Sequence, residues 1–242
     1  LGQIQAGEAA TAFLMFAYSF LALASYNAIK PITRSKFIKD LGAEDVPYMV
    51  IAAAALIGIV MLGYSWLVAR LPRRWSLPMV QSGIIGLLVA FGLLFRTDAK
   101  VLSVLFYLFG LILGILLMSQ FWTLANLVYD PRQAKRLFGF IGAGSSLGGL
   151  AGSLVTRQYV KQIGSNNVIL ISAGVMTLCV LIVITIIVRE RLTDLSGTVE
   201  REQGVGWRQA IALLRGSEHL QLIALVITFA ALGAYVIEQQ LL

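Results

Sequence analysis

The sequence predicts an all-α, polytopic membrane protein, and two observations lead to this fold class. Of its 242 residues, 58% are hydrophobic and 13% are charged, and the mean hydropathy is +0.84, a composition that soluble domains do not sustain. Seven stretches with almost no charge are each long enough to cross a bilayer, which takes about 20 apolar residues in a helix. These stretches are residues 9–29, 46–69, 75–95, 101–129, 137–156, 168–188 and 220–242.

Each stretch is expected to be a helix, because lipid offers no partner for an unpaired backbone N–H or C=O. The first six stretches contain no Asp, Glu, Lys or Arg, and the seventh contains Glu238. Pro47 and Pro78 fall near helix starts, where a missing N–H is tolerated. Pro31 follows Lys30 at the end of the first stretch, and we expect it to end that helix where a group of cations begins.

Helix count and loop length predict the domain organisation. Residues 1–188 form a six-helix bundle, residues 189–219 a charged central loop, and residues 220–242 a seventh helix that begins a second half. This order is typical of major facilitator-type transporters, so we expect the chain to be part of a longer protein. Within the loop, Trp207, Ile211 and Leu214 have the spacing of a short amphipathic helix at the membrane surface, or of an ordinary tether.

The distribution of basic residues indicates the topology. With a cytoplasmic N-terminus, eleven of the 19 Lys and Arg residues fall in inner loops and the other eight in outer loops, a slight positive-inside bias. The net charge of +7 therefore reflects topology and lipid contact rather than nucleic-acid binding. The first outer loop departs from the bias, because it carries four cations that need a partner or a function, namely Lys30, Arg34, Lys36 and Lys39.

The glycine-rich segment at residues 139–153 is interpreted as a packing surface. No Lys follows a glycine as in a phosphate-binding loop, and Leu147 stands where a dinucleotide fingerprint needs its third glycine. Gly144, Gly148 and Gly152 are spaced four apart, which on a membrane helix lets a neighbouring backbone approach closely.

The basic segment "DPRQAKR", residues 130–136, precedes these glycines and has two possible roles. It could anchor the helices on the positive-inside side, or it could form a gate in which Asp130 pairs with a cation of another inner loop. The gate candidates are Arg73, Arg74, Asp130, Arg132, Lys135 and Arg136.

Polar residues inside the apolar stretches are candidates for substrate binding, because they are costly in lipid unless they are used. They are Tyr26, Asn27, Gln120, Trp122, Asn126 and Glu238. The aromatic rings could stack on a purine and the amides could bond base edges, although aromatic belts and helix–helix hydrogen bonds use the same residue types. The single histidine and the absence of catalytic motifs predict no enzyme, no cofactor and no metal site.

Two segments resemble the ATP/ADP translocase family, the nucleotide exchangers of plastids and intracellular bacteria, and its bacterial relatives. "KPITRSKFIKDLGAEDVPYMV", residues 30–50, is similar to the basic end of that family's helix one and a G-A-E-x-x-P-[YF] entry into helix two. "FWTLANLVYDPRQAKRLFGFIGAG", residues 121–144, is similar to an F-W-x-x-A-N near helix four followed by an A-K-R-x-[FY] loop.

The resemblance implies a twelve-helix transporter of the bacterial inner membrane that exchanges ATP and ADP or a related anionic solute. It implies that Lys30, with Arg34, binds the anionic groups. The exchangers carry a glutamate about three helical turns before the Phe-Trp pair, where this chain has Gly110. An alternative is therefore a non-transporting membrane scaffold with a fused or associated soluble domain. In either case membrane lipids are expected partners.

Overall fold

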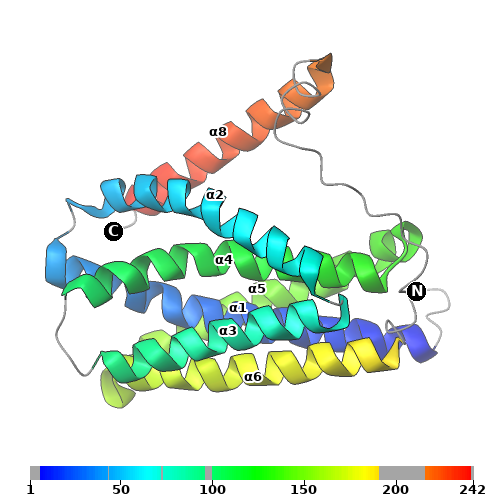
Figure 1. The fold of residues 1–242 in the computed structure, drawn as a ribbon, viewed down its shortest axis with the longest axis horizontal. Coiled ribbons are helices and arrows are strands. Elements are labelled where there is room, and N and C mark those ends of the chain that lie inside the picture. Colours follow the sequence, from blue (N-terminus) through cyan, green and yellow to red (C-terminus); the bar gives the residue numbers. More distant parts are fainter. Residues whose placement is uncertain (1–5, 43, 72, 96–99, 191–215, 241–242) are drawn as a thin grey trace. The chain divides into compact units, whose positions relative to one another are not determined.

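The computed structural model describes residues 6–42, 44–71, 73–95, 100–190 and 216–240. Every element in these ranges is an α-helix, which confirms the predicted all-α class (Figure 1). Residues up to Asp194 form one compact unit and residues from Leu195 onward form another. The helices are α1 (Ala6–Leu41), α2 (Val46–Arg70), α3 (Arg73–Leu94), α4 (Lys100–Val128), α5 (Pro131–Ile163), α6 (Ser165–Arg189) and α8 (Glu218–Gln240).

Six of these helices, α1 to α6, are long and apolar enough to cross a membrane. Each coincides with one of the first six predicted stretches, although α3 and α4 end one residue before the stretches 75–95 and 101–129 do. The seventh stretch corresponds to α8, whose apolar part within the described residues is Glu218–Ala230. The proposed amphipathic helix at Trp207, Ile211 and Leu214 lies outside the described residues.

Helix α1 corrects the expectation that Pro31 ends the first helix. It continues without interruption for 36 residues to Leu41. Proline removes one backbone hydrogen bond, but the residues after it are held by tertiary packing. Ile32 and Phe37 are 4% and 0% exposed, and the Phe37 ring stacks on Tyr107 of α4 with ring centroids 4.8 Å apart. Burial of this extension outweighs the local preference for a break.

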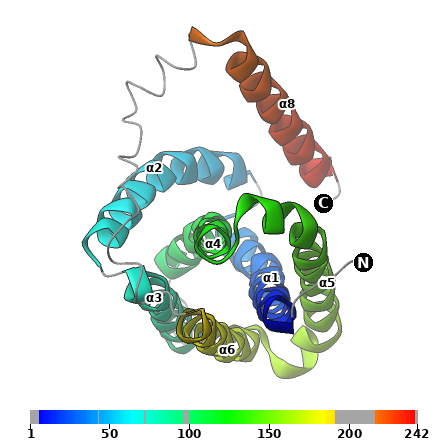
Figure 2. The ribbon, with the colours of Figure 1, turned by 90° about the vertical axis from the view of Figure 1, so that its right-hand side faces the viewer.

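Helix α1 makes the most extensive contacts in the bundle. It packs against α4, α5 and α6, while α3 packs against α6 and α2 contacts α3 and α4 (Figure 2). The main hydrophobic core includes Met15 and Ile29 of α1, Leu113 of α4 and Met176 of α6, all fully buried. Residues on α1 are therefore placed where several helices meet.

The interface between α1 and α5 is built on Gly144, Gly148 and Gly152. A Cβ atom added to Gly148 would overlap the carbonyl oxygen of Phe20, and one on Gly152 would overlap that of Ala24. A Cβ on Gly144 would lie 2.7 Å from the carbonyl oxygen of Phe16. The two backbones are in direct contact along this line, which is the close approach that small residues allow in membrane helices.

The interface between α1 and α4 also contains glycines, but these face side chains. A Cβ on Gly110 would lie 2.8 Å from the Thr33 methyl carbon, and one on Gly114 would lie 2.7 Å from the Tyr26 hydroxyl oxygen. The space beside Gly110 is therefore filled by the Thr33 side chain.

Candidate binding cavity between α1, α4 and α5

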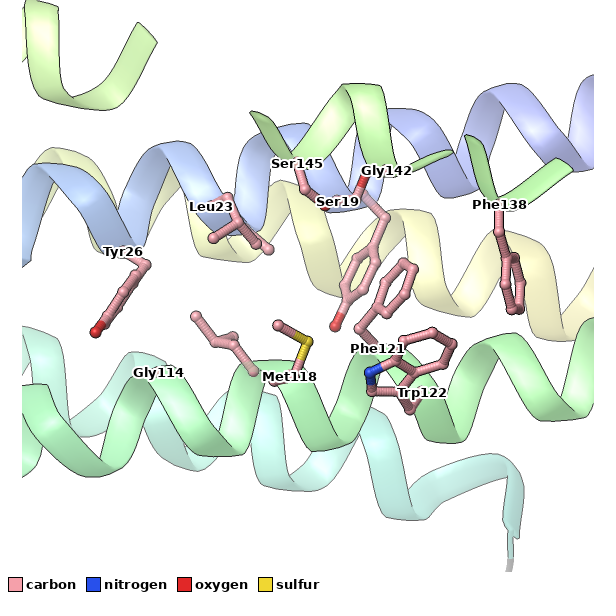
Figure 3. Close-up of a pocket in the computed structure, with 13 residues that line it drawn as sticks. Ser19, Leu23, Tyr26, Gly114, Met118, Phe121, Trp122, Phe138, Gly142 and Ser145 are labelled. Atoms are coloured by element: carbon pink, nitrogen blue, oxygen red, sulfur yellow. The ribbon is translucent and has the colours of Figure 1, made fainter. Parts of the chain in front are cut away.

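A cavity of about 370 Å³ lies between α1, α4 and α5, within the size range of small-molecule sites. Figure 3 shows Tyr26 near one end of it and Trp122 and Phe138 near the other. Its lining consists of Tyr18, Ser19, Ala22, Leu23, Tyr26, Gly114, Leu117, Met118, Phe121, Trp122, Phe138, Gly142 and Ser145.

The cavity lies at middle depth in the bundle. Tyr18 and Tyr26 follow Glu8 by 10 and 18 residues on a continuous helix, which places them about 15 and 27 Å along the axis from that end. Helix α1 spans 36 residues, or about 54 Å, so both residues lie in its middle third.

The lining is mostly apolar and aromatic. Trp122 meets Phe121 and Phe138 edge-on, with ring centroids 5.4 Å apart in both pairs. The Ser19 hydroxyl is engaged by backbone carbonyl oxygens, those of Phe16 at 2.9 Å and Ile141 at 3.0 Å. None of the 13 lining residues is charged or carries an amide. The cavity therefore offers ring faces and hydrocarbon, with a few hydroxyls.

The predicted anion-binding residues lie on α1 just beyond the cavity. Lys30 follows Tyr26 by four positions, so their side chains are neighbours on one helix face, with Cβ atoms about 5–6 Å apart. Lys30 and Arg34 are both partly buried. Further along α1, the Lys36 ammonium group lies 3.8 Å from the centroid of the Phe95 ring, and Lys39 is exposed.

The predicted amide residues lie outside the cavity lining. Gln120 is fully buried, and its amide nitrogen and oxygen have no hydrogen-bond partner among the described residues. Asn126 is exposed. Asn27 donates from Nδ2 to the Leu23 carbonyl oxygen at 3.0 Å. Of the predicted substrate-binding residues, the structure thus brings Tyr26 and Trp122 into one cavity. The side chain of Glu238 lies outside the part of the chain that the structure describes.

The basic segment between the fourth and fifth predicted stretches is not a turn but the start of α5. Asp130 is the N-cap residue, and its backbone N–H donates to Oε1 of Gln133 at 3.2 Å. Pro131 at the first position suits a helix start, because no N–H is required there. Arg132 and Lys135 are exposed. The side chains of Arg73 and Arg74, proposed to pair with Asp130, lie outside the described residues.

A polar cluster joins α1, α5 and α6 at this end of the bundle. Glu8 accepts from Arg136 at 2.7 Å and from Gln133 at 2.9 Å, and Thr11 donates to Glu190. Burial, with the nearby Glu190 and Glu8, raises the pKa of Tyr129 to about 12. The candidate gate residue Arg136 thus has its carboxylate partner within the same bundle.

Sequence reasoning missed several of the residues that form these two regions. Tyr18, Phe121 and Phe138 line the cavity, but an aromatic residue in an apolar helix carries no signal that separates a cavity wall from lipid contact. Glu8 lies just before the first apolar stretch. The signal available for it was its position as the acidic residue in the first turn of α1.

No family model matches this chain, and neither a curated protein nor a solved structure is significantly similar to it. Its class therefore follows from the structure itself. It is a multi-pass, α-helical membrane protein with an aromatic-lined cavity at middle depth.

Proposed function

We propose that this chain belongs to a secondary transporter of organic anions, built on a major facilitator-type plan and working by alternating access. The observation that carries the proposal is the position of Lys30, one helical turn from the Tyr26 wall of the cavity. A solute in the cavity would have a cation within reach. The charge-free stretch of α1, residues 9–29, ends just before this Lys30.

The nature of the anion is narrowed by Gly110. In the nucleotide exchangers that the sequence resembles, an acidic residue stands there, whereas here Thr33 fills the space beside the glycine. Exchange of ATP and ADP remains within the proposal, but this difference favours a related anionic solute. We propose the bacterial inner membrane as the location, with the N-terminus in the cytoplasm.

The polar cluster around Glu8 supports a gating role for the start of α5. In the proposed topology this end faces the cytoplasm. Arg136 is 44% exposed and Glu8 is 23% exposed, so the pair is accessible to a competing partner. Arg132 and Lys135 would attract anions to this mouth. A non-transporting scaffold has no need of a cavity at middle depth beside a cation, so we favour transport.

The test is counterflow in proteoliposomes that contain the full-length protein. Vesicles loaded with ADP, ATP or another organic anion are assayed for uptake of the same labelled anion. Lys30→Ala is expected to lower uptake about tenfold or more, because a hydrogen bond to a charged group contributes about 1.5–3 kcal/mol. Lys39→Ala, which removes the same charge from an exposed position of the same helix, should leave uptake nearly unchanged.

Two outcomes would contradict the proposal. One is uptake no faster than in protein-free vesicles for every anion tested. The other is an equal effect of Lys30→Ala and Lys39→Ala, which would mean that charge at this end of α1 matters without a specific site.

A further inference from the structure

We infer that the cavity between α1, α4 and α5 binds an aryl or alkyl group, so that the substrate class is an amphipathic organic anion. The inference deepens the proposed function and rests on it only for the anionic group, which is assigned to Lys30. The binding of the apolar group follows from the cavity alone.

The first argument is the chemistry of the wall. Ring faces and hydrocarbon come from Leu117, Phe121, Trp122 and Phe138, and Leu117 is 3% exposed. Transfer of an apolar group from water into such surroundings is favourable in proportion to the apolar area covered. Trp122 is 45% exposed, so part of its ring surface is uncovered and can meet a further ring.

The second argument is what the wall lacks. A polar heterocycle enters a buried site at a cost unless its N–H and carbonyl groups find partners. The lining has no amide or charged residue, and Ser19 is already engaged by backbone carbonyls. Three hydroxyls and the Trp122 indole N–H remain, which are few partners for the several polar groups of such a ring. The amides of Asn27, Gln120 and Asn126 all lie outside the lining. A small inorganic anion would be worse placed still, because it would lose water without meeting a cation in the cavity.

An apolar group can reach the cavity from two sources, a soluble anion or the acyl chain of a membrane lipid. Both satisfy the same wall chemistry. Lys30, beside the Tyr26 end, favours the soluble anion, because it lies one turn from the wall and would hold a head group while the apolar group fills the cavity.

Gly142 and Gly139 provide a matched pair of variants on α5. A Cβ atom at either glycine meets nothing within 4 Å, so a side chain can begin at both positions without displacing a neighbour. Gly142 lines the cavity and Gly139 does not. Gly142→Leu should therefore fill the cavity, while Gly139→Leu controls for the change in helix propensity.

The measurement is fluorescence of Trp122 in the full-length protein in lipid nanodiscs. Phe replaces every other tryptophan of the full-length protein, which within this chain means Trp66, Trp75 and Trp207. The probe 4-nitrophenyl phosphate should quench Trp122 saturably, and inorganic phosphate should not. Gly142→Leu should weaken binding of the probe about tenfold or more, the scale on which a hydrophobic pocket discriminates by size. Gly139→Leu should change it less than about twofold.

Further arms separate the possible failures. Lys30→Ala should weaken the binding of 4-nitrophenyl phosphate and leave the binding of neutral 4-nitrobenzyl alcohol unchanged. An equal effect on both compounds would overturn the assignment of the anion to Lys30 but not the cavity site. Brominated phosphatidylcholine could also quench Trp122. If Gly142→Leu relieves that quenching and the soluble probe has no effect, the cavity is a lipid site. Equal binding of ADP and the nitrophenyl probe, both lost in Gly142→Leu, would overturn the apolar substrate class. Saturable binding without transport would contradict the proposed function alone.

Discussion

Helix α1 packs against α5 and against α4 through glycines in both interfaces, but the atoms that face the glycines differ. Along α5, Gly148 and Gly152 face backbone carbonyls of α1. Along α4, Gly110 faces the Thr33 side chain and Gly114 faces the tip of the Tyr26 side chain. One interface is backbone against backbone, and the other is backbone against side chain.

This difference indicates which helices can separate. A side chain can change rotamer when its neighbour moves, whereas a carbonyl oxygen moves only if its helix moves. We therefore expect α1 and α5 to move together as one unit and α4 to part from α1. Such a movement would open the cavity near Tyr26, where α1 and α4 are in contact.

The largest expected effect comes from adding a methyl group between the two backbones. Gly148→Ala should destabilise the fold by about 1–3 kcal/mol or more, because α1 as a whole must shift. Reversible unfolding in mixed detergent micelles would measure this. Gly139→Ala places the same methyl group in open space on the same helix, and a comparable loss in that variant would refute the explanation.

A smaller effect is expected in the other interface. Gly114→Ala should destabilise less than Gly148→Ala, because the Tyr26 ring can turn away, and Tyr26→Ala should relieve the remaining strain. A double-mutant cycle should show coupling between Gly114 and Tyr26 of about 0.5–3 kcal/mol. Phe20→Ala should give no such rescue of Gly148→Ala, since a backbone oxygen opposes that methyl group. Rescue in both cycles, or in neither, would remove the distinction between the two interfaces.

The smallest effect is expected near the polar cluster, where α4 ends. The Tyr129 hydroxyl has no hydrogen-bond partner among the described residues, so Tyr129→Phe should change stability little at neutral pH. Because the pKa of Tyr129 is raised to about 12 from an ordinary value of about 10, its neutral form favours folding. This contribution is complete below the unfolded pKa and is lost as pH rises from about 10 to about 12.

Thermal midpoints at pH 9 and pH 11 would measure this contribution. The wild type should lose more stability over that interval than Tyr129→Phe. An identical loss in the two proteins would mean that the environment of Tyr129 does not hold its proton.

Composition and periodicity sufficed for the helical class and for the central parts of α1 to α6, because a bilayer accepts little else. The course of α1 beyond Pro31 was not predictable, because it depends on Phe37 meeting Tyr107 from a distant part of the chain. Glycine spacing predicted a packing face on α5. It could not predict that α1 is the partner, because that depends on how the helices assemble in the tertiary structure. The cavity was only partly foreseen, through Tyr26 and Trp122, because its remaining walls use residue types that lipid-facing helices also use.

The length of α1 has a mechanical consequence. The helix spans 36 residues, or about 54 Å, well over the roughly 30 Å of hydrocarbon. Its last residue, Leu41, lies 17 residues beyond Ala24, the last α1 residue whose backbone contacts one of these three α5 glycines. A tilt of α1 together with α5 by about 5° would move Leu41 by about 2 Å relative to Ala24. A slight tilt of α1 beside the cavity would therefore produce a larger displacement of its end at the opposite membrane surface.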